Sequence, residues 1–126
     1  MKKIIQTKDA PEPIGPYSQA VLVNGLLFTS GQIAIEPESG KLILDTIANE
    51  TKQVMENLKA VLVGADMTFD NVVKSTIFIL NMDDFGAINK VYGDYFKDPI
   101  APARETVQVA KLPKNVNIEI SIIASK

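Results

Sequence analysis

The spacing of apolar residues along the chain predicts two amphipathic helices. Between residues 46 and 63, apolar side chains recur at steps of seven, four and three with polar residues between them, which is the periodicity of a helix with one buried face. Asp45 or Thr46 can cap the start of this helix, and Gly64 can end it. Helical spacing returns over residues 83–96, and the prolines that follow predict the end of the second helix.

Short runs of apolar and β-branched residues predict six strands around these helices. Asn24-Gly25 separates two of the runs and favours a tight hairpin, because both central residues of a type I′ turn take a positive φ. The last run alternates, with branched apolar residues on one side and polar residues on the other. The predicted strands cover residues 3–6, 20–23, 26–29, 71–80, 105–110 and 116–124.

The order of these elements, three strands followed by helix, strand, helix and two strands, predicts an α+β fold. Each helix joins two strands and favours a crossover connection, whereas the first hairpin is antiparallel, so we predict a mixed sheet. Both helices are expected to stack on one face of that sheet. The opposite face would then be bare, and we expect other copies of the chain to cover it.

Length and composition place the chain among ordinary globular proteins. It has 126 residues, of which 46% are hydrophobic and 22% charged, and this predicts a single domain over residues 1–126. The apolar runs are too short to span a membrane, and the first residues lack the apolar region of a secretory signal, so we expect a cytoplasmic protein. The net charge of −2 and the scattered lysines argue against a nucleic-acid surface.

The chain contains neither cysteine nor histidine, which limits its chemistry. Thiol nucleophiles, disulfides, the common zinc sites and Ser-His-Asp triads are excluded, and no acidic run has the spacing of an EF-hand. An enzyme with this sequence must therefore work with arginine, lysine, tyrosine, carboxylates, hydroxyls, backbone amides and water.

Two charged residues stand out as candidates for chemistry. Arg104 is the single arginine among thirteen basic residues, and it is either a remnant in a lysine-rich chain or a position that needs the planar fork of donors that lysine lacks. Glu119 lies within an otherwise apolar strand, so it is either paired, in a wet cleft, or exposed on an edge strand. If the last two strands pair as a hairpin, positions 104 and 119 fall at comparable heights and form either one site or a structural salt bridge.

Two further positions are candidates for binding. Tyr17 ends a stiff proline-rich loop, residues 10–17, and offers either a fixed hydroxyl or a half-buried ring. Ser30 and Gly31 end a strand, where a glycine either lets a ligand approach backbone N–H groups or simply forms a bulge or turn.

Five segments of the chain together resemble the RidA family, the reactive intermediate deaminases. The resemblance runs over almost the whole chain in the family's order and spacing, and PAR followed about fifteen residues later by IEI is its most specific part. The segments are IGPYSQA (14–20), TSGQI (29–33), MDDF with a following N-x-x-Y (82–92), PAR (102–104) and LPKNVNIEI (112–120).

This resemblance implies a homotrimer with a chorismate-mutase-like fold and clefts between subunits. It implies hydrolysis of short-lived 2-imino acids, formed from 2-aminoacrylate and 2-aminocrotonate, to 2-keto acids and ammonia, with no metal or cofactor. Arg104 would then bind the substrate carboxylate, and Glu119 would hold the attacking water. The pocket would be completed by Tyr17, Ser30, the Gly31 backbone, Asn89 and Thr106.

One residue departs from the family's pattern. Glu105 stands where the family usually has a small or apolar residue, often serine. Strand alternation sends its side chain to the face opposite that of Arg104, so we expect it to leave the arginine accessible. The sequence leaves two further possibilities for Glu105, which are a competing ion pair and an altered contact between subunits.

Two other functions compete with imine hydrolysis. One is a non-catalytic regulatory module that binds small carboxylates on the same trimeric scaffold, because fold alone does not settle function. The presence of both Arg104 and Glu119 favours hydrolysis over binding alone. The other is RNA cleavage, which the acidic balance and the missing histidines disfavour.

Overall fold

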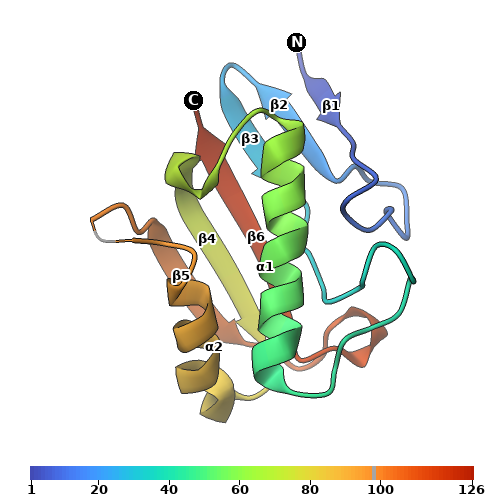
Figure 1. Ribbon diagram of the computed structural model, residues 1–126, viewed down its shortest axis with the longest axis vertical. Helices are drawn as coiled ribbons and strands as arrows, with labels where there is room; N and C mark the ends of the chain where they lie inside the picture. Colours follow the sequence, from blue (N-terminus) through green and yellow to red (C-terminus); the bar gives the residue numbers. More distant parts are fainter. Residues whose placement is uncertain (98) are drawn as a thin grey trace.

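The six predicted strands form one mixed sheet in the computed structural model, which describes residues 1–97 and 99–126 (Figure 1). The strands lie in the order β1-β2-β3-β6-β4-β5. β4 and β5 are parallel, and every other neighbouring pair is antiparallel, so the predicted α+β fold is confirmed. The strands are β1 (Lys3–Ile5), β2 (Ala20–Val23), β3 (Leu26–Thr29), β4 (Val72–Ile79), β5 (Ala103–Gln108) and β6 (Ile118–Ser125).

The longer helix, α1 (Ile47–Gly64), lies across one face of the sheet, and the second helix packs on the same face, as predicted (Figure 1). The hydroxyl of Thr46 accepts a hydrogen bond from the backbone N–H of Asn49 at 3.0 Å and so caps the helix start. The helix ends at the predicted glycine. Its apolar stripe is buried against the sheet and includes Val54, Met55, Leu58, Val61 and Leu62.

The second helix, α2 (Phe85–Gly93), is shorter than the helix predicted over residues 83–96. A separate 3-10 turn precedes it, because the side chain of Asn81 accepts a hydrogen bond from the backbone N–H of Asp83 at 2.9 Å. Glycine and aspartate at its end are poor helix formers. Within residues 1–97 and 99–126, neither helix has the length and apolar character needed to cross a membrane.

Side-chain alternation divides the central strands between two environments. On β6 the residues that face the helices are buried isoleucines, whereas Glu119 between them points to the open face. Phe78 of the neighbouring β4 lies opposite Glu119 and shares that open face. The helix-facing residues of the two strands form the centre of the core: Ile77, Ile79, Ile118, Ile120 and Ile122.

The turn between β2 and β3 is the predicted tight hairpin. Asn24 has a φ of 51° and Gly25 a φ of 78°, so both central residues occupy the left-handed region that this turn requires. The turn fixes the register of the antiparallel pair, in which Ala20 lies opposite Thr29. The residue that follows Thr29 enters the candidate site described below.

The last two strands do not pair as a hairpin, so that prediction is wrong. β4 lies between β5 and β6 and pairs with both. Because β5 runs parallel to β4, the chain leaves both strands at the same end of the sheet, and residues 109–117 pass over the end of β4 to reach β6. The N–H of Val109 donates to the carbonyl of Ile79 at 2.8 Å. The N–H of Leu80 donates to the carbonyl of Asn117 at 3.0 Å and fixes the far side of this passage.

Candidate active site

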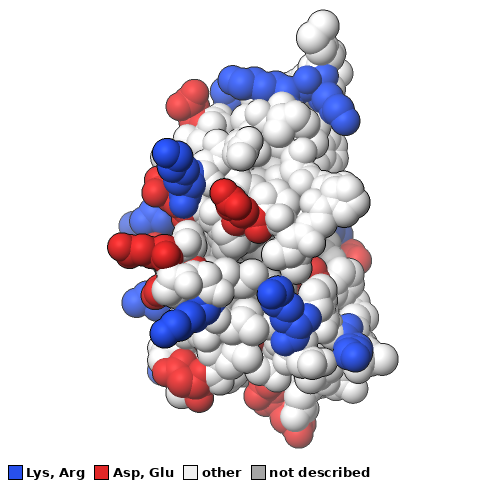
Figure 2. All heavy atoms as spheres, turned by 90° about the vertical axis from the view of Figure 1, so that its right-hand side faces the viewer, with Lys and Arg blue, Asp and Glu red and all other residues white. Residues whose placement is uncertain are grey.

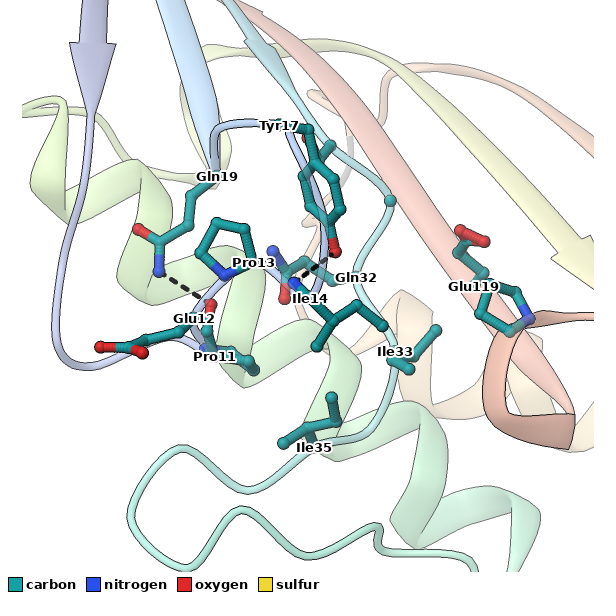
Figure 3. A pocket seen from close by; sticks show the side chains of 13 residues that line it. Pro11, Glu12, Pro13, Ile14, Tyr17, Gln19, Gln32, Ile33, Ile35 and Glu119 are labelled. Carbon is teal, nitrogen blue, oxygen red and sulfur yellow. Dashed lines mark hydrogen bonds between the residues drawn. The ribbon is translucent and has the colours of Figure 1, made fainter.

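A cleft of about 300 Å³ lies between the proline-rich loop, the segment after β3 and the strand β6 (Figure 3). Four of the predicted site residues line it, namely Tyr17, Ser30, Gly31 and Glu119. The fold therefore brings together residues that are separated by up to 102 positions in the sequence. Much of the remaining wall is apolar and consists of Pro11, Pro13, Ile14, Ile33, Ile35 and Pro113.

Gln19 holds the proline-rich loop in place. Its side chain is only 2% exposed, and each of its polar groups is hydrogen-bonded. The amide oxygen accepts from the N–H of Thr7 at 2.7 Å, and the amide nitrogen donates to the carbonyl of the same residue at 3.0 Å. The nitrogen also donates to the carbonyls of Ala10 at 3.2 Å and Pro11 at 2.9 Å, the second of which Figure 3 draws. Gln19 thus replaces the backbone ladder that a loop rich in proline cannot form.

Gln19→Ala is expected to lower the free energy of unfolding by roughly 2–4 kcal/mol, because it leaves several partly buried backbone groups without partners. Chemical denaturation in urea measures the change. The control is Gln6→Ala, which removes an exposed glutamine from the same N-terminal segment. Equal unfolding free energies for the two variants would contradict the role of Gln19.

Gly31 lies directly against the side chain of Glu119. A Cβ atom at position 31 would lie 2.7 Å from the carboxyl carbon of Glu119 and 2.9 Å from its Cγ, which is closer than real Cβ contacts. The adjacent backbone is fixed to β6, since Gln32 and Ile120 exchange N–H to carbonyl hydrogen bonds at 2.8 and 3.1 Å. Any larger residue at position 31 would therefore displace the Glu119 side chain from the position it holds.

The surroundings of Glu119 favour the protonated form of its carboxyl. It is half-buried on β6, which lies inside the sheet, so exposure on an edge strand is excluded. Burial raises the pKa of its carboxyl above the ordinary value of 4.5. Within the described ranges 1–97 and 99–126 it forms no ion pair. A carboxylate whose charge is only weakly stabilised holds a proton more readily, which suits acid-base chemistry.

Tyr17 and Ser30 complete the polar side of the cleft. The Tyr17 side chain is 48% exposed, and its hydroxyl accepts a hydrogen bond from the N–H of Ile14 at 3.2 Å (Figure 3). This contact fixes the hydroxyl oxygen and leaves its hydrogen available to a ligand. The Ser30 hydroxyl instead donates to the carbonyl of Ser18 and braces the loop.

Arg104 lies outside this cleft, on the edge strand β5, and packs against α2. Its Nη1 donates to Oδ1 of Asn89 at 2.7 Å. The guanidinium carbon lies 5.1 Å from the centroid of the Tyr92 ring and 5.5 Å from that of the Phe85 ring. In the part of the chain that the structure describes, no carboxylate pairs with this arginine. Among the described residues, its other N–H donors have no carboxylate partner and can bind an anionic ligand.

The two residues after Arg104 follow the alternation of the strand. Thr106 lies on the same side of β5 as Arg104, and its Oγ1 is buried without a hydrogen-bond partner among the described residues. Glu105 points to the other face, where its carboxylate pairs with Nζ of Lys74 at 2.7 Å. Glu105 consequently does not compete for the guanidinium, and the ion pair left open by the sequence forms with a lysine.

The predicted site residues fall into two groups within one chain. We call Tyr17, Ser30, Gly31 and Glu119 the cleft half-site, and we call Asn89, Arg104 and Thr106 the arginine half-site.

The two half-sites are far apart in a single chain. Arg104 pairs with Ser75 of β4 and Glu119 pairs with Phe78, so they lie three residues apart along the sheet, which is roughly 10 Å. Ser75 is buried on the helix side, whereas Phe78 faces the open side, so the two side chains also point to opposite faces. The prediction that positions 104 and 119 lie at comparable heights is therefore wrong.

A buried carboxylate on α1 holds the start of β6 and was not predicted from the sequence. Glu50 is fully buried, and its carboxylate accepts hydrogen bonds from the N–H and the side-chain amide of Asn117, both at 2.8 Å. It accepts a third from the N–H of Ile118 at 3.2 Å. These bonds fix the start of the strand that carries Glu119. The available signal was a charged residue inside the apolar stripe of the helix.

The charged side chains elsewhere among the described residues form neither a metal site nor a nucleic-acid surface on the side seen in Figure 2. Among residues 1–97 and 99–126, no three acidic side chains lie close enough together to hold a metal ion. Figure 2 shows lysines and acidic residues interspersed on the side of the molecule that faces right in Figure 1. On that side, the described chain presents no continuous basic field to a phosphate backbone.

Known proteins resemble this chain over nearly its whole length. Residues 7–126 match the family model described as Endoribonuclease L-PSP. The 2-iminobutanoate/2-iminopropanoate deaminase of Rattus norvegicus is 46% identical over 124 residues, which cover 98% of this chain and 90% of that protein. Among solved structures, YyfA of the conserved Rid protein family from Yersinia pestis has a TM-score of 0.97 and 49% identity, with 100% of both chains covered.

A second solved structure that resembles this chain contains a bound ligand. E. coli TdcF with bound serine has a TM-score of 0.93 and 41% identity, and the match covers 98% of both chains. The sequence resemblance, the matched family model and the shared fold agree, and the chain belongs to the RidA family, whose sequence model carries the name Endoribonuclease L-PSP.

Proposed function

We propose that this protein hydrolyses reactive 2-imino acids to 2-keto acids and ammonia. The observation that carries the proposal is the state of Arg104, whose guanidinium is oriented by Asn89 and has no carboxylate partner among the described residues. A planar fork of this kind binds a carboxylate through two parallel hydrogen bonds, which lysine cannot do. The name of the rat relative supports an imine as the group next to that carboxylate.

Glu119 and one water would supply the chemistry. The carboxylate takes a proton from water while the water oxygen bonds to the imine carbon, and it returns this proton to the nitrogen. The amino alcohol then loses ammonia: the C–N bond breaks, the hydroxyl proton passes through Glu119 to the departing nitrogen, and the carbonyl forms. Free imines hydrolyse readily, so positioning and modest acid-base help suffice.

We infer that two copies of the chain complete one site. A small ligand cannot span the two half-sites of one chain, because their side chains point to opposite faces of the sheet. The arginine half-site lies at the free edge of β5, and the open face exposes the apolar side chains of Phe28 and Val107, which suits a contact with another copy. In the trimer that the RidA resemblance implies, the edge of β5 of one copy would reach the cleft half-site of the next.

Mixing two inactive variants tests this arrangement. Arg104→Ala and Glu119→Gln are each expected to be inactive, but chains that are unfolded and refolded together should form sites in which both residues are intact. Random assembly of trimers gives about one quarter of such sites, so we expect about one quarter of the wild-type rate. Light scattering verifies that the mixture is trimeric. A mixed trimer without any recovered activity would rule out a shared site.

The reaction itself is tested by generating the imine in place. An amino-acid oxidase or a threonine dehydratase supplies the 2-imino acid, and the appearance of the 2-keto acid is followed with and without the protein. Acceleration that requires Arg104 supports the proposal. A folded trimer that gives no acceleration contradicts it.

A module that binds small carboxylates without catalysis is the second candidate. It is favoured by the serine held in the TdcF structure, because serine carries a carboxylate of the kind that Arg104 would bind. Titration with a 2-keto acid separates the two functions. Binding by a protein that does not accelerate imine hydrolysis would select the binding module.

A further inference from the structure

We propose that Phe85, Asn89 and Tyr92 of α2 form a cradle that fixes the orientation of the Arg104 guanidinium, so that Phe85 and Tyr92 are positioning residues for carboxylate binding. The effect on ligand affinity rests on the proposed function, in which Arg104 binds the substrate carboxylate. The cradle itself rests only on contacts within the chain.

The spacing of the three residues explains why they meet one side chain. Phe85, Asn89 and Tyr92 stand at positions i, i+4 and i+7 of α2, so they lie on one face of the helix. The hydrogen bond from Nη1 to Asn89 holds one corner of the guanidinium at 2.7 Å. One hydrogen bond leaves the group free to turn about that contact. The two rings, at 5.1 and 5.5 Å from the guanidinium carbon, restrict this rotation.

Tyr92 forms the rigid part of the cradle. Its side chain is buried, and its hydroxyl donates to Oγ of the fully buried Ser75 at 2.8 Å. Its ring also packs on Phe96 with the ring centroids 4.8 Å apart. Burial is the largest influence on its hydroxyl and raises the pKa, so the ring stays neutral beside the cation. The position of this ring is therefore set by the core.

Phe85 forms the outer part of the cradle. It begins α2 and is 37% exposed, so much of its ring is not needed to fill the core. This partly exposed ring lies beside the single arginine of the chain. Because the face of an aromatic ring attracts a guanidinium, the ring stabilises the position of the Arg104 side chain. Phe85 can thus be replaced with little effect on folding, which makes it the residue to test.

A guanidinium held in advance loses less conformational freedom when a carboxylate binds. Removal of a cradle ring should therefore weaken ligand binding and raise KM while leaving kcat unchanged. A substitution that only destabilised the fold would instead lower the apparent kcat, because less protein would be folded, and would leave KM unchanged.

The first experiment observes the guanidinium without any ligand. Because Arg104 is the only arginine, its side-chain N–H signals in a ¹⁵N NMR spectrum need no assignment by mutagenesis. In the wild type we expect separate Nη–H signals, which report slow rotation, and shifts caused by the nearby rings. Phe85→Leu should average the signals and reduce these shifts, and Phe85→Tyr should restore them.

The second experiment measures binding of 2-oxobutanoate by calorimetry. Phe85→Leu is expected to weaken binding about fivefold, and Phe85→Tyr to stay within about twofold of the wild type. The control is Tyr95→Leu, which removes a ring that contacts Phe69 and Glu56 at the end of α2. It should change neither the guanidinium signals nor the affinity.

The two experiments separate the two proposals. Separate guanidinium signals that collapse in Phe85→Leu, in a wild type that binds no 2-oxobutanoate, would support the cradle and reject the proposed function. Freely rotating guanidinium signals in the wild type would overturn the cradle. So would a Phe85→Leu variant with wild-type signals and wild-type affinity, whatever the activity of the protein.

Discussion

Arg104→Lys is expected to fold and assemble normally and to lose roughly 100-fold or more in kcat/KM for 2-imino acids. Lysine keeps the positive charge at the edge of β5, but it offers a single point of attachment in place of two parallel donors. The substrate carboxylate could then pivot, and the imine carbon would no longer be held at a fixed distance from the water on Glu119. The coupled assay at substrate concentrations below KM measures the loss.

The matched control for this variant is the reverse exchange. Lys90→Arg alters an exposed position of α2 next to Asn89, and it should keep kcat/KM within about twofold of the wild type. Turnover close to the wild type in Arg104→Lys would mean that a positive charge is sufficient, and the proposed bidentate contact would have to be abandoned.

Glu119→Gln is expected to lower kcat by roughly 10²–10⁴-fold and, at the same time, to make the fold more stable at neutral pH. The amide has the shape of the carboxylate and fits beside Gly31, but it cannot take a proton from water. It also removes a half-buried charge without a cationic partner among the described residues. Urea unfolding at pH 7 measures the gain in stability, and a variant less stable than the wild type would contradict this account of the Glu119 environment.

The raised pKa of Glu119 predicts how both properties depend on pH. As the pH falls through this pKa, which lies above 4.5, kcat of the wild type should fall because the base becomes protonated. Stability follows the opposite course, since the folded state binds the proton more tightly than the unfolded state. Glu119 makes its full contribution to stability at pH values below the pKa that its carboxyl has in the unfolded chain. This contribution is lost as the pH rises through the higher pKa that the carboxyl has in the folded protein. Glu119→Gln should lack this component of the pH dependence.

Local signals in the sequence were sufficient to predict the elements of the fold. Helical periodicity, the Thr46 cap and the Asn24-Gly25 pair each act over a few residues, and the structure confirms all three. The order of the strands depends on distant contacts. The hairpin between the last two strands was the reasonable default for consecutive strands, but the parallel pairing of β5 with β4 leaves the other edge of β4 to β6.

The sequence pointed to candidate residues but not to how the fold arranges them. Tyr17, Gly31 and Glu119 meet in one cleft, yet Arg104 lies on the other side of the sheet. The face of the sheet to which a strand residue points depends on how its strand pairs with the neighbouring strands. This pairing involves segments that are distant in the sequence, so it cannot be predicted from a short stretch of residues. The contact between Gly31 and Glu119 joins segments far apart in the chain, and it could not have been inferred from either segment alone.

The hydrogen bonds of the Gln19 side chain reach only main-chain atoms, namely the N–H and carbonyl of Thr7, just before the proline-rich loop, and the carbonyls of Ala10 and Pro11 within it. Every amino acid supplies a carbonyl, so these contacts with Gln19 do not depend on the side chains at positions 10 and 11. Side chains that line the cleft, such as Glu12 and Ile14, can therefore be replaced without loss of the hydrogen bonds that Gln19 makes to the loop. Such substitutions change the surface that a ligand meets in the cleft while the attachment of the loop stays the same.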